Sequence, residues 1–246
     1  MPRAKWSSST TRNSPLPSQH KAKAENGLEP AAAPAQVPCA FRRPAAVVTF
    51  LVVTVAALAA DLASKHAVFE ALLRDPSIPE RIERLRKVYG ADLTTHDALR
   101  RLQVQQQVAP GVDFTLSTNR GIVFGWYMPP WSVLIATVLT IGLVGYFFAT
   151  SDARTRTAHV ALAMILAGAL GNLYDRMFSA VALPGMEPIT QEVRDFIDCS
   201  RIEIGGVNYP WIFNVADVWL VVGVALLVLY WWFGRHPITP PTRRGH

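Results

Sequence analysis

Four long apolar segments constrain how this chain can fold. They cover residues 45–63, 131–149, 158–178 and 211–233, and each is close to the roughly 20 residues that a helix needs to cross a bilayer. Lipid offers the backbone no hydrogen-bond partners, so each segment predicts a spanning α-helix. The chain is also 50% hydrophobic and only 17% charged, which is typical of a small integral membrane protein. The sequence therefore predicts an all-α membrane protein with four transmembrane helices.

The third apolar segment is the least regular of the four. Polar residues interrupt it at His159, Asn172, Asp175 and Arg176. Hydropathy alone would also allow a re-entrant segment at this point.

Basic residues near the helix ends predict the orientation in the membrane. They are frequent before the first segment, between the second and third, and after the fourth, so both termini are predicted to be cytoplasmic. The loops 65–130 and 179–210 mix both signs or lean acidic, and they are predicted to be extracytoplasmic. The net charge of +6 then follows from topology and attraction to anionic lipids, with no need for nucleic acid. Cys39 and Cys199 fall on opposite sides in this topology and cannot bridge each other.

The chain divides into three parts. Residues 1–43 are rich in Ser, Pro, Ala and Lys, which predicts a disordered cytoplasmic tail. Residues 44–235 are the predicted membrane domain, and residues 236–246 a cytoplasmic tail. A rival interpretation makes the amino-terminal part a cleaved signal peptide, because residues 57–59 have the small-x-small form of a cleavage site. The i,i+4 pair Asp61 and Lys65 continues the helix beyond that site and favours a spanning helix.

The predicted outer loop contains its own elements. Residues 80–89 and 97–108 have apolar positions at helical spacing, which predicts short surface helices, and residues 112–126 read as a small extended or β segment at the membrane surface. In the helices, small residues at close spacing are expected to let neighbouring helices approach each other: Gly142, Gly145, Ala167 and Gly171.

The same polar pattern, Asn-x-x-Asp, occurs in the third and fourth segments, as Asn172 to Asp175 and Asn214 to Asp217. A charged residue at the centre of a spanning helix costs about 2.5 to 3.5 kcal/mol on insertion scales, so it rarely occurs without a partner or a task. At 1.5 Å per residue, the two carboxylates lie about 5 and 9 Å from the outer ends of their helices. Asp61 and Lys65 reach the same end.

Two acids at one level suggest a carboxylate pair. In each pattern the Asn and the Asp share a helix face, so an amide can orient the carboxylate beside it. Two carboxylates in a poorly hydrated site cannot easily both ionise, so one keeps a proton. Aspartic proteases use this arrangement to activate water and to protonate the leaving amine.

Two other classes of function also place acids in membranes. A transporter or proton relay would spread its acids through the bilayer depth, whereas here they gather near one end. A structural assembly factor would use the acids for packing alone. No Gly-rich phosphate loop, His-Glu-x-x-His or Cys-x-x-Cys motif occurs, so no metal or other cofactor is expected.

Four motifs together carry a resemblance to a known family. They are Asp-Leu-Ala-Ser-Lys at 61–65, Asn-Arg-Gly-Ile-Val-Phe at 119–124, Gly-Ala-Leu-Gly-Asn-Leu-Tyr-Asp-Arg at 168–176 and Phe-Asn-Val-Ala-Asp at 213–217. Residues 195–198, Asp-Phe-Ile-Asp, match a further common segment. Over residues 45–233 the chain resembles the lipoprotein signal peptidases (signal peptidase II) of bacteria.

The resemblance implies an aspartic endopeptidase of the bacterial inner membrane, monomeric, with its site near the extracytoplasmic face. Its substrate would be a prolipoprotein whose cysteine carries diacylglycerol, and membrane lipids would surround it. Asp175 and Asp217 would be catalytic, and Asp61 with Lys65 would stabilise the outer rim. The residues implied to line or brace the site are Asn119, Gly121, Asn172, Arg176 and Asn214.

The chain also departs from the family pattern. Val123 and Gly125 stand where the family has a small residue and Ser. The loop 66–112 is longer than usual, and the resemblance gives no function to it or to the amino-terminal tail.

Overall fold

A computed structural model describes residues 38–123, 126–127, 129–209 and 211–233 of the chain. The predicted disorder of residues 1–37, the predicted tail 236–246 and the departure at Gly125 lie outside the described residues. The last residues of the predicted tail are folded, because a 3₁₀ helix, η1 (Ala40–Arg42), precedes the first long helix. Ala40 is fully buried, and its backbone N–H donates to the Ser151 carbonyl.

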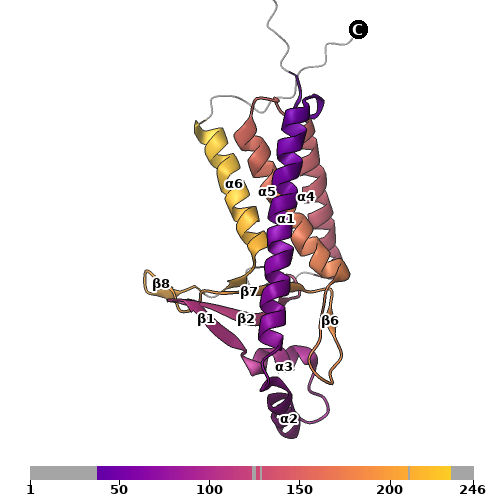
Figure 1. The fold of residues 1–246 in the computed structure, drawn as a ribbon, viewed down its shortest axis with the longest axis vertical. Helices are drawn as coiled ribbons and strands as arrows, with labels where there is room; N and C mark the ends of the chain where they lie inside the picture. The colour runs from indigo at the N-terminus through magenta and orange to yellow at the C-terminus, as the bar shows by residue number, and fades with distance from the viewer. Residues whose placement is uncertain (1–37, 124–125, 128, 210, 234–246) are drawn as a thin grey trace, which may run out of the picture. The chain divides into compact units, whose positions relative to one another are not determined.

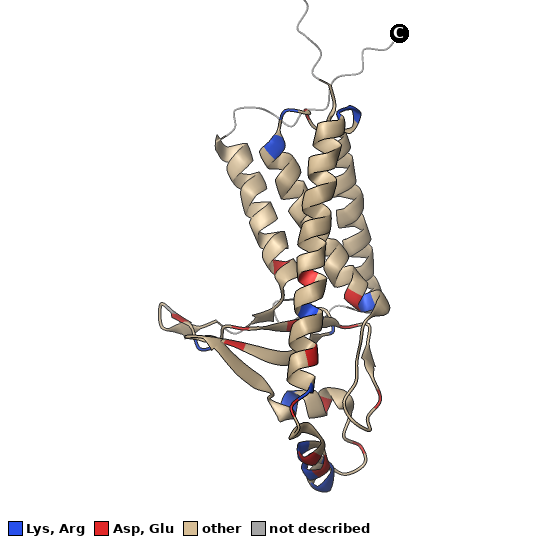
Figure 2. Cartoon of the chain, in the orientation of Figure 1, with Lys and Arg blue, Asp and Glu red and all other residues tan. Residues whose placement is uncertain are grey.

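In the described part of the chain, four helices are long and apolar enough to cross a membrane, which agrees with the predicted number. They are α1 (Pro44–Leu73), α4 (Pro130–Thr150), α5 (Arg156–Phe178) and α6 (Val215–Phe233), and Figure 1 shows them side by side. Charged residues are sparse along these helices and reappear where the helices meet the sheet (Figure 2). The protein is therefore a multi-pass membrane protein.

The fourth helix begins at Val215 rather than at residue 211 because Asn214 caps it. The Asn214 side-chain oxygen accepts a hydrogen bond from the Asp217 N–H at 3.1 Å, and the Asp217 carboxylate accepts from the Asn214 N–H at 3.1 Å. This reciprocal pair is a capping box, which satisfies two backbone donors at the helix start. The second Asn-x-x-Asp pattern is therefore a helix start.

Helix α5 is the central helix of the bundle. In its spanning window 61% of the residues are buried, against 28% in α1 and 11% in α4 and α6. Small residues let α6 approach α5 closely: a Cβ on Gly168 would lie 2.5 Å from the Ala216 carbonyl oxygen, and one on Gly223 would lie 2.8 Å from the Ala161 carbonyl oxygen. Gly142 and Gly145 on α4 have no such neighbour within 4 Å, so the prediction that they mediate close packing was wrong.

A small antiparallel sheet lies at the end of the bundle where α5 ends and α6 begins (Figure 1). Its strand order is β1 (Gln105–Ala109), β2 (Val112–Asn119), β7 (Val193–Asp198) and β10 (Ile212–Phe213). Residues 112–119 of the extended segment predicted at 112–126 form β2 of this sheet, but the strands after α5 were not predicted, so an all-α class describes the chain incompletely. The described residues also form two-stranded hairpins: β3–β4 (Ile122–Val123, Trp126–Tyr127), β5–β6 (Ala180–Val181, Ile189–Thr190) and β8–β9 (Glu203–Ile204, Val207–Asn208).

Two short helices follow α1: α3 (Thr95–Leu102) packs against β2 of the sheet, and α2 (Ile78–Tyr89) packs against α3. Helix α3 ends earlier than predicted, because Gln103 adopts a left-handed conformation (φ 44°) and β1 follows. The last turns of α1 share a core with these elements, which explains why α1 extends ten residues beyond the predicted end at residue 63. The buried residues of this core include Phe69, Leu72, Ile78, Ile82, Leu99, Leu102, Leu116 and Phe196.

The close α5–α6 contact predicts a specific weakness. Gly223→Ala would place its Cβ against the backbone of α5, which cannot move aside without shifting the helix, and overpacking of this kind costs about 1 to 3 kcal/mol. We expect a lower thermal midpoint for the purified protein in detergent, followed by circular dichroism. Gly145→Ala on α4 is the matched control, and its midpoint should not fall. Equal midpoints for the two variants would contradict the close contact.

Candidate active site

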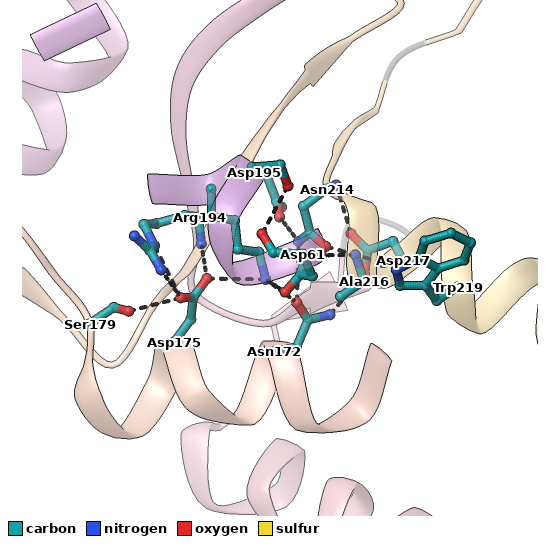
Figure 3. Close-up of polar contacts among 12 residues, drawn as sticks. Asp61, Asn172, Asp175, Ser179, Arg194, Asp195, Asn214, Ala216, Asp217 and Trp219 are labelled. Carbon is teal, nitrogen blue, oxygen red and sulfur yellow. Dashed lines mark hydrogen bonds and ion pairs between the residues drawn. The ribbon is translucent and has the colours of Figure 1, made fainter. Parts of the chain in front are cut away.

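A buried polar cluster lies where α1, α5, α6 and the sheet meet (Figure 3). Its members come from all four elements, and the side chains of Asp61, Lys65, Asp175 and Asn214 are fully buried. The structure therefore brings together the residues that the sequence placed at one end of the bundle. The cluster also includes two residues of β7 that were not predicted as site residues, Arg194 and Asp195.

Lys65 is the centre of the cluster. Its ammonium nitrogen lies 2.8 Å from Asp61 Oδ2, 3.0 Å from Asn172 Oδ1 and 3.3 Å from Asp175 Oδ2. A buried charge is tolerated only when partners replace its lost water, and here three oxygens do so. The prediction that Lys65 stabilises an outer rim needs correction, because the side chain is fully buried.

Asp61 links α1 to the start of α6. Its Oδ1 accepts a hydrogen bond from the Ala216 backbone N–H at 2.8 Å, which is one of the N–H groups that a helix start leaves without an internal partner. On the α5 side, a Cβ on Gly171 would collide with Asp61 Oδ2. The Gly171 position therefore needs glycine because the carboxylate occupies the space beside it.

The Asp175 carboxylate accepts hydrogen bonds from several side-chain and backbone donors. Arg194 donates to it through Nη2 at 2.6 Å, Nε at 3.0 Å and its backbone N–H at 3.0 Å, and Ser179 Oγ donates at 2.8 Å. Together with Lys65, these contacts use the acceptor capacity of a carboxylate. Among the described contacts, Asp175 connects to Asp217 through Lys65 and Asn172. This carboxylate joins α5 to β7.

Asp217 is held by fewer groups and is only partly buried. Its Oδ1 accepts from Asn172 Nδ2 at 2.9 Å, and its Oδ2 accepts from the Asn214 N–H. The ammonium of Lys65 can only donate, so the Asn172 oxygen must face Lys65 and its amide nitrogen must face Asp217. The amide of the first Asn-x-x-Asp pattern therefore orients the carboxylate of the second, rather than the one beside it.

Asp195 on β7 resembles Asp217, because it too is held by asparagine side chains. It is 4% exposed, its Oδ1 accepts from Asn214 Nδ2 at 2.6 Å, and the Asn119 side chain also hydrogen-bonds it. Burial and the negative charge of Asp217 raise the pKa of Asp195 to about 7, against the opposing effect of these hydrogen bonds. Asn214 therefore binds two acids at once, Asp195 through its side chain and Asp217 through its backbone.

The remaining predicted site residues frame these acids. Asn119 Oδ1 accepts from the Gly121 N–H at 2.8 Å, and Gly121 has φ 102°, a conformation that favours glycine. Arg176 Nη1 donates to the Asn172 carbonyl at 3.2 Å, and its charge acts on Asp195 and Asp217.

The charges of the cluster nearly balance. It holds one more acid than base, and a proton on Asp195 makes it neutral: the bases are Lys65, Arg176 and Arg194, and the acids are Asp61, Asp175, Asp195 and Asp217. In the described part of the chain, no group of three or more His, Cys, Asp and Glu residues could hold a metal ion. The chemistry that these residues offer is proton transfer between two acids and water.

Only an indirect signal for Asp195 is present in the sequence. It lies in the segment 195–198 that matches the family, but it is not part of a predicted helix, and the residue three positions before it is not Asn. Its proximity to Asp217 depends on the pairing of β7 with β2 and β10, which links strands far apart in the chain.

The chain is similar to known proteins in sequence and in fold. The family model for signal peptidase (SPase) II matches residues 53–233. The lipoprotein signal peptidase of Rhodopseudomonas palustris is 31% identical over 154 residues, which cover 61% of this chain and 82% of the relative. That of Aquifex aeolicus is 31% identical over 60% of this chain and 83% of the relative, and that of Clostridium acetobutylicum is 26% identical over 61% and 85%.

Two solved structures, both described as a bacterial membrane enzyme, share the fold. Each has a TM-score of 0.50 and 24% sequence identity, with coverage of 76% of this chain and 88% or 95% of the other. The similarity in sequence, which extends over most of the membrane domain, assigns the protein: the chain belongs to the signal peptidase II family.

Proposed function

We propose that this protein is an aspartic endopeptidase that removes signal peptides from bacterial prolipoproteins, with Asp195 and Asp217 as its catalytic pair. The substrate class is supported by the relatives named lipoprotein signal peptidase. The observation that carries the mechanism is that Asn214 holds both acids, one of which has a pKa near neutrality.

The geometry favours Asp195 over Asp175 as the partner of Asp217. Asp175 already accepts from Lys65, Ser179 and three donors of Arg194, so it has little capacity left for water or substrate. The prediction that Asp175 is catalytic rests on the sequence alone. In this proposal Asp175 has a structural role: it joins α5 to β7 by holding Arg194, which directly precedes Asp195.

The two acids would divide the chemistry. Ionised Asp217 takes a proton from water as the water oxygen attacks the scissile carbonyl carbon, and protonated Asp195 donates a hydrogen bond to the developing oxyanion. When the C–N bond breaks, a proton passes from the pair to the leaving amine. The products are a new carboxyl group and a new amine, and the pair returns to one shared proton.

The surrounding residues would keep the pair ready. Asn172 and the Asn214 backbone hold Asp217 in place, and the charge of Arg176 would stabilise the negative charge that develops near both acids. Lys65 and Asp61 would hold the ends of α1, α5 and α6 together. These side chains are fixed by packing and hydrogen bonds, so little reorganisation is needed during reaction.

The proposed location follows from the basic residues. Before α1, at the link between α4 and α5 and after α6, Lys and Arg outnumber Asp and Glu, which favours a cytoplasmic position for that end of the bundle and an extracytoplasmic position for the acid pair. An apolar signal peptide could then lie in the bilayer of the inner membrane with its cleavage site at the depth of the pair. A cysteine carrying diacylglycerol would keep its acyl chains in the same lipid layer, and a single copy of the chain contains the whole pair.

The first prediction concerns the pair itself. Asp195→Asn and Asp217→Asn should each slow cleavage of a diacylglyceryl-modified prolipoprotein at least about 100-fold, the contribution expected of a positioned general acid or base. Purified protein in detergent, assayed by gel for the shortened product, gives the measurement. Asp198→Asn is the matched control, because this buried acid of the same strand binds the Ser200 N–H instead.

The second prediction separates Asp175 from the pair. Asp175→Asn should lower the thermal midpoint strongly, because breaking a buried ion pair costs about 3 to 5 kcal/mol, and its cleavage should fall only with the folded fraction. If Asp175→Asn is folded but inactive and Asp195→Asn is active, the catalytic partner of Asp217 is Asp175 and our assignment of Asp195 is wrong.

The third prediction is a pH dependence. Asp195 acts in its protonated form and has a pKa of about 7, so kcat/KM should fall as the pH rises through this value. The plot of kcat/KM against pH reports ionisations of the free enzyme. A value that stays constant from pH 6 to about 9 would exclude Asp195 as the proton donor.

The fourth prediction tests the orientation with the two free cysteines, Cys39 and Cys199. Cys39 precedes α1, and Cys199 follows β7 at the other end of the bundle. In intact spheroplasts a membrane-impermeant maleimide should label Cys39→Ser protein, through Cys199, and should leave Cys199→Ser protein unlabelled. Labelling of both variants after detergent lysis shows that each thiol can react, and the reverse pattern in spheroplasts would invert the proposed topology.

A further inference from the structure

The segment between α1 and β1 makes contacts that the proposed reaction does not use. It packs against the connection between α5 and β7: Thr95 Oγ1 donates to the Glu187 carbonyl, and Arg86 Nη2 donates to the Gly185 carbonyl. A cavity of about 750 Å³ lies between the two parts. Its lining includes Glu192 and two basic or titratable side chains that contact it, His96 and Arg120.

Glu192 joins three separate elements through one carboxylate. Its Oε1 accepts from Arg120 Nε at 2.7 Å, its Oε2 lies 3.6 Å from His96 Nε2 on α3, and its side chain is only 9% exposed. Among the described residues, Oε2 has no hydrogen-bond partner. A carboxylate buried to this extent depends on its ion pairs, so Arg120 is its main support.

The ion pair crosses the end of the β2–β7 ladder. Asn119, the last residue of β2, pairs with Val193, the first residue of β7. Arg120 directly follows Asn119, and Glu192 directly precedes Val193. The Arg120–Glu192 ion pair therefore links the ends of β2 and β7 directly beyond their last paired residues.

Both strand ends carry parts of the proposed site. Asn119 hydrogen-bonds Asp195, which lies two residues beyond Val193. Without the ion pair, the last residue pair could separate, and the distance between the Asn119 amide and the Asp195 carboxylate would vary. A small displacement of a catalytic group far from the mutated position can cost as much as about 100-fold in rate.

We propose that Glu192 is a positioning residue for the reaction, which holds Asn119 and Asp195 in place through Arg120 and connects the α3 segment to the site through His96. The inference rests on the proposed function, because it takes Asp195 as catalytic. It assigns a contribution to the segment 66–112, to which the family resemblance gives none.

The test compares Glu192→Gln, Arg120→Gln and the double variant in the prolipoprotein cleavage assay. Each single variant should lower kcat roughly 10-fold with little change in KM, since substrate binding is retained and the reacting groups are misplaced. The double variant should be no slower than the slower single variant, because both changes remove the same ion pair. Arg120→Lys keeps the charge and should recover most of the lost kcat.

Glu80→Gln is the matched control. It removes an exposed ion pair with Arg84 on α2, and both kcat and the thermal midpoint should equal those of the unmodified protein. The Glu192 and Arg120 variants should melt at a lower temperature than this control, because a buried ion pair is broken, and their kcat should fall by more than the loss of folded protein accounts for. A kcat loss in the double variant that equals the product of the single losses would show independent effects and overturn the inference.

The remaining outcomes show whether the inference, the proposed function or both are wrong. Unchanged kcat in Glu192→Gln, or a loss that follows the unfolded fraction, would show that Glu192 has no positioning role. If Asp195→Asn cleaves as fast as the unmodified protein, the proposed function fails and the inference falls with it. If Asp195→Asn is inactive while Glu192→Gln is fully active, the proposed function stands and only the inference is wrong.

Discussion

The burial of the Lys65 ammonium determines how the site is built. This charge has no exposure to water, so Asp61, Asp175 and Asn172 must replace its hydration. The first two of these are acids, and each uses its remaining oxygen on another element: Asp61 binds the start of α6 and Asp175 binds Arg194 of β7. One buried cation thus fixes the positions of three helices and the sheet, which explains why so many charges are tolerated at this end of the bundle.

The four acids of the cluster differ in what holds them. Asp61 and Asp175 are ionic partners of buried bases, and Asp175 also accepts from Ser179 and from the backbone and side chain of Arg194. Asp195 and Asp217 are held mainly by neutral amides, from Asn119, Asn172 and Asn214. Amides orient a carboxylate without neutralising it, which is why we propose that this second pair exchanges a proton. The asparagines of the two Asn-x-x-Asp patterns therefore bind Asp195 and Asp217.

Particular residues show how far the sequence could be interpreted. The four spanning helices, the two short helices near residues 80 and 97, and the meeting of Asp61, Lys65, Asn172 and Asn214 at one end were predicted from apolar length, helical spacing and depth. The contacts within this set were predicted less well. Asn172 orients Asp217 instead of Asp175, and Lys65 is central instead of peripheral, because such contacts depend on how helices are rotated about their axes.

The sequence alone determined the number of membrane helices and the end of the bundle at which the polar residues gather, since hydrophobic length and a fixed rise per residue are local properties of the chain. Only the tertiary structure decided which acids face each other. Asp195 reaches Asn214 because β7 pairs with β2 and β10, and Asp175 is occupied because Arg194 folds back onto α5. These are contacts between distant segments, and they are set by strand pairing and by the need to compensate buried charge, neither of which is recorded in local residue spacing.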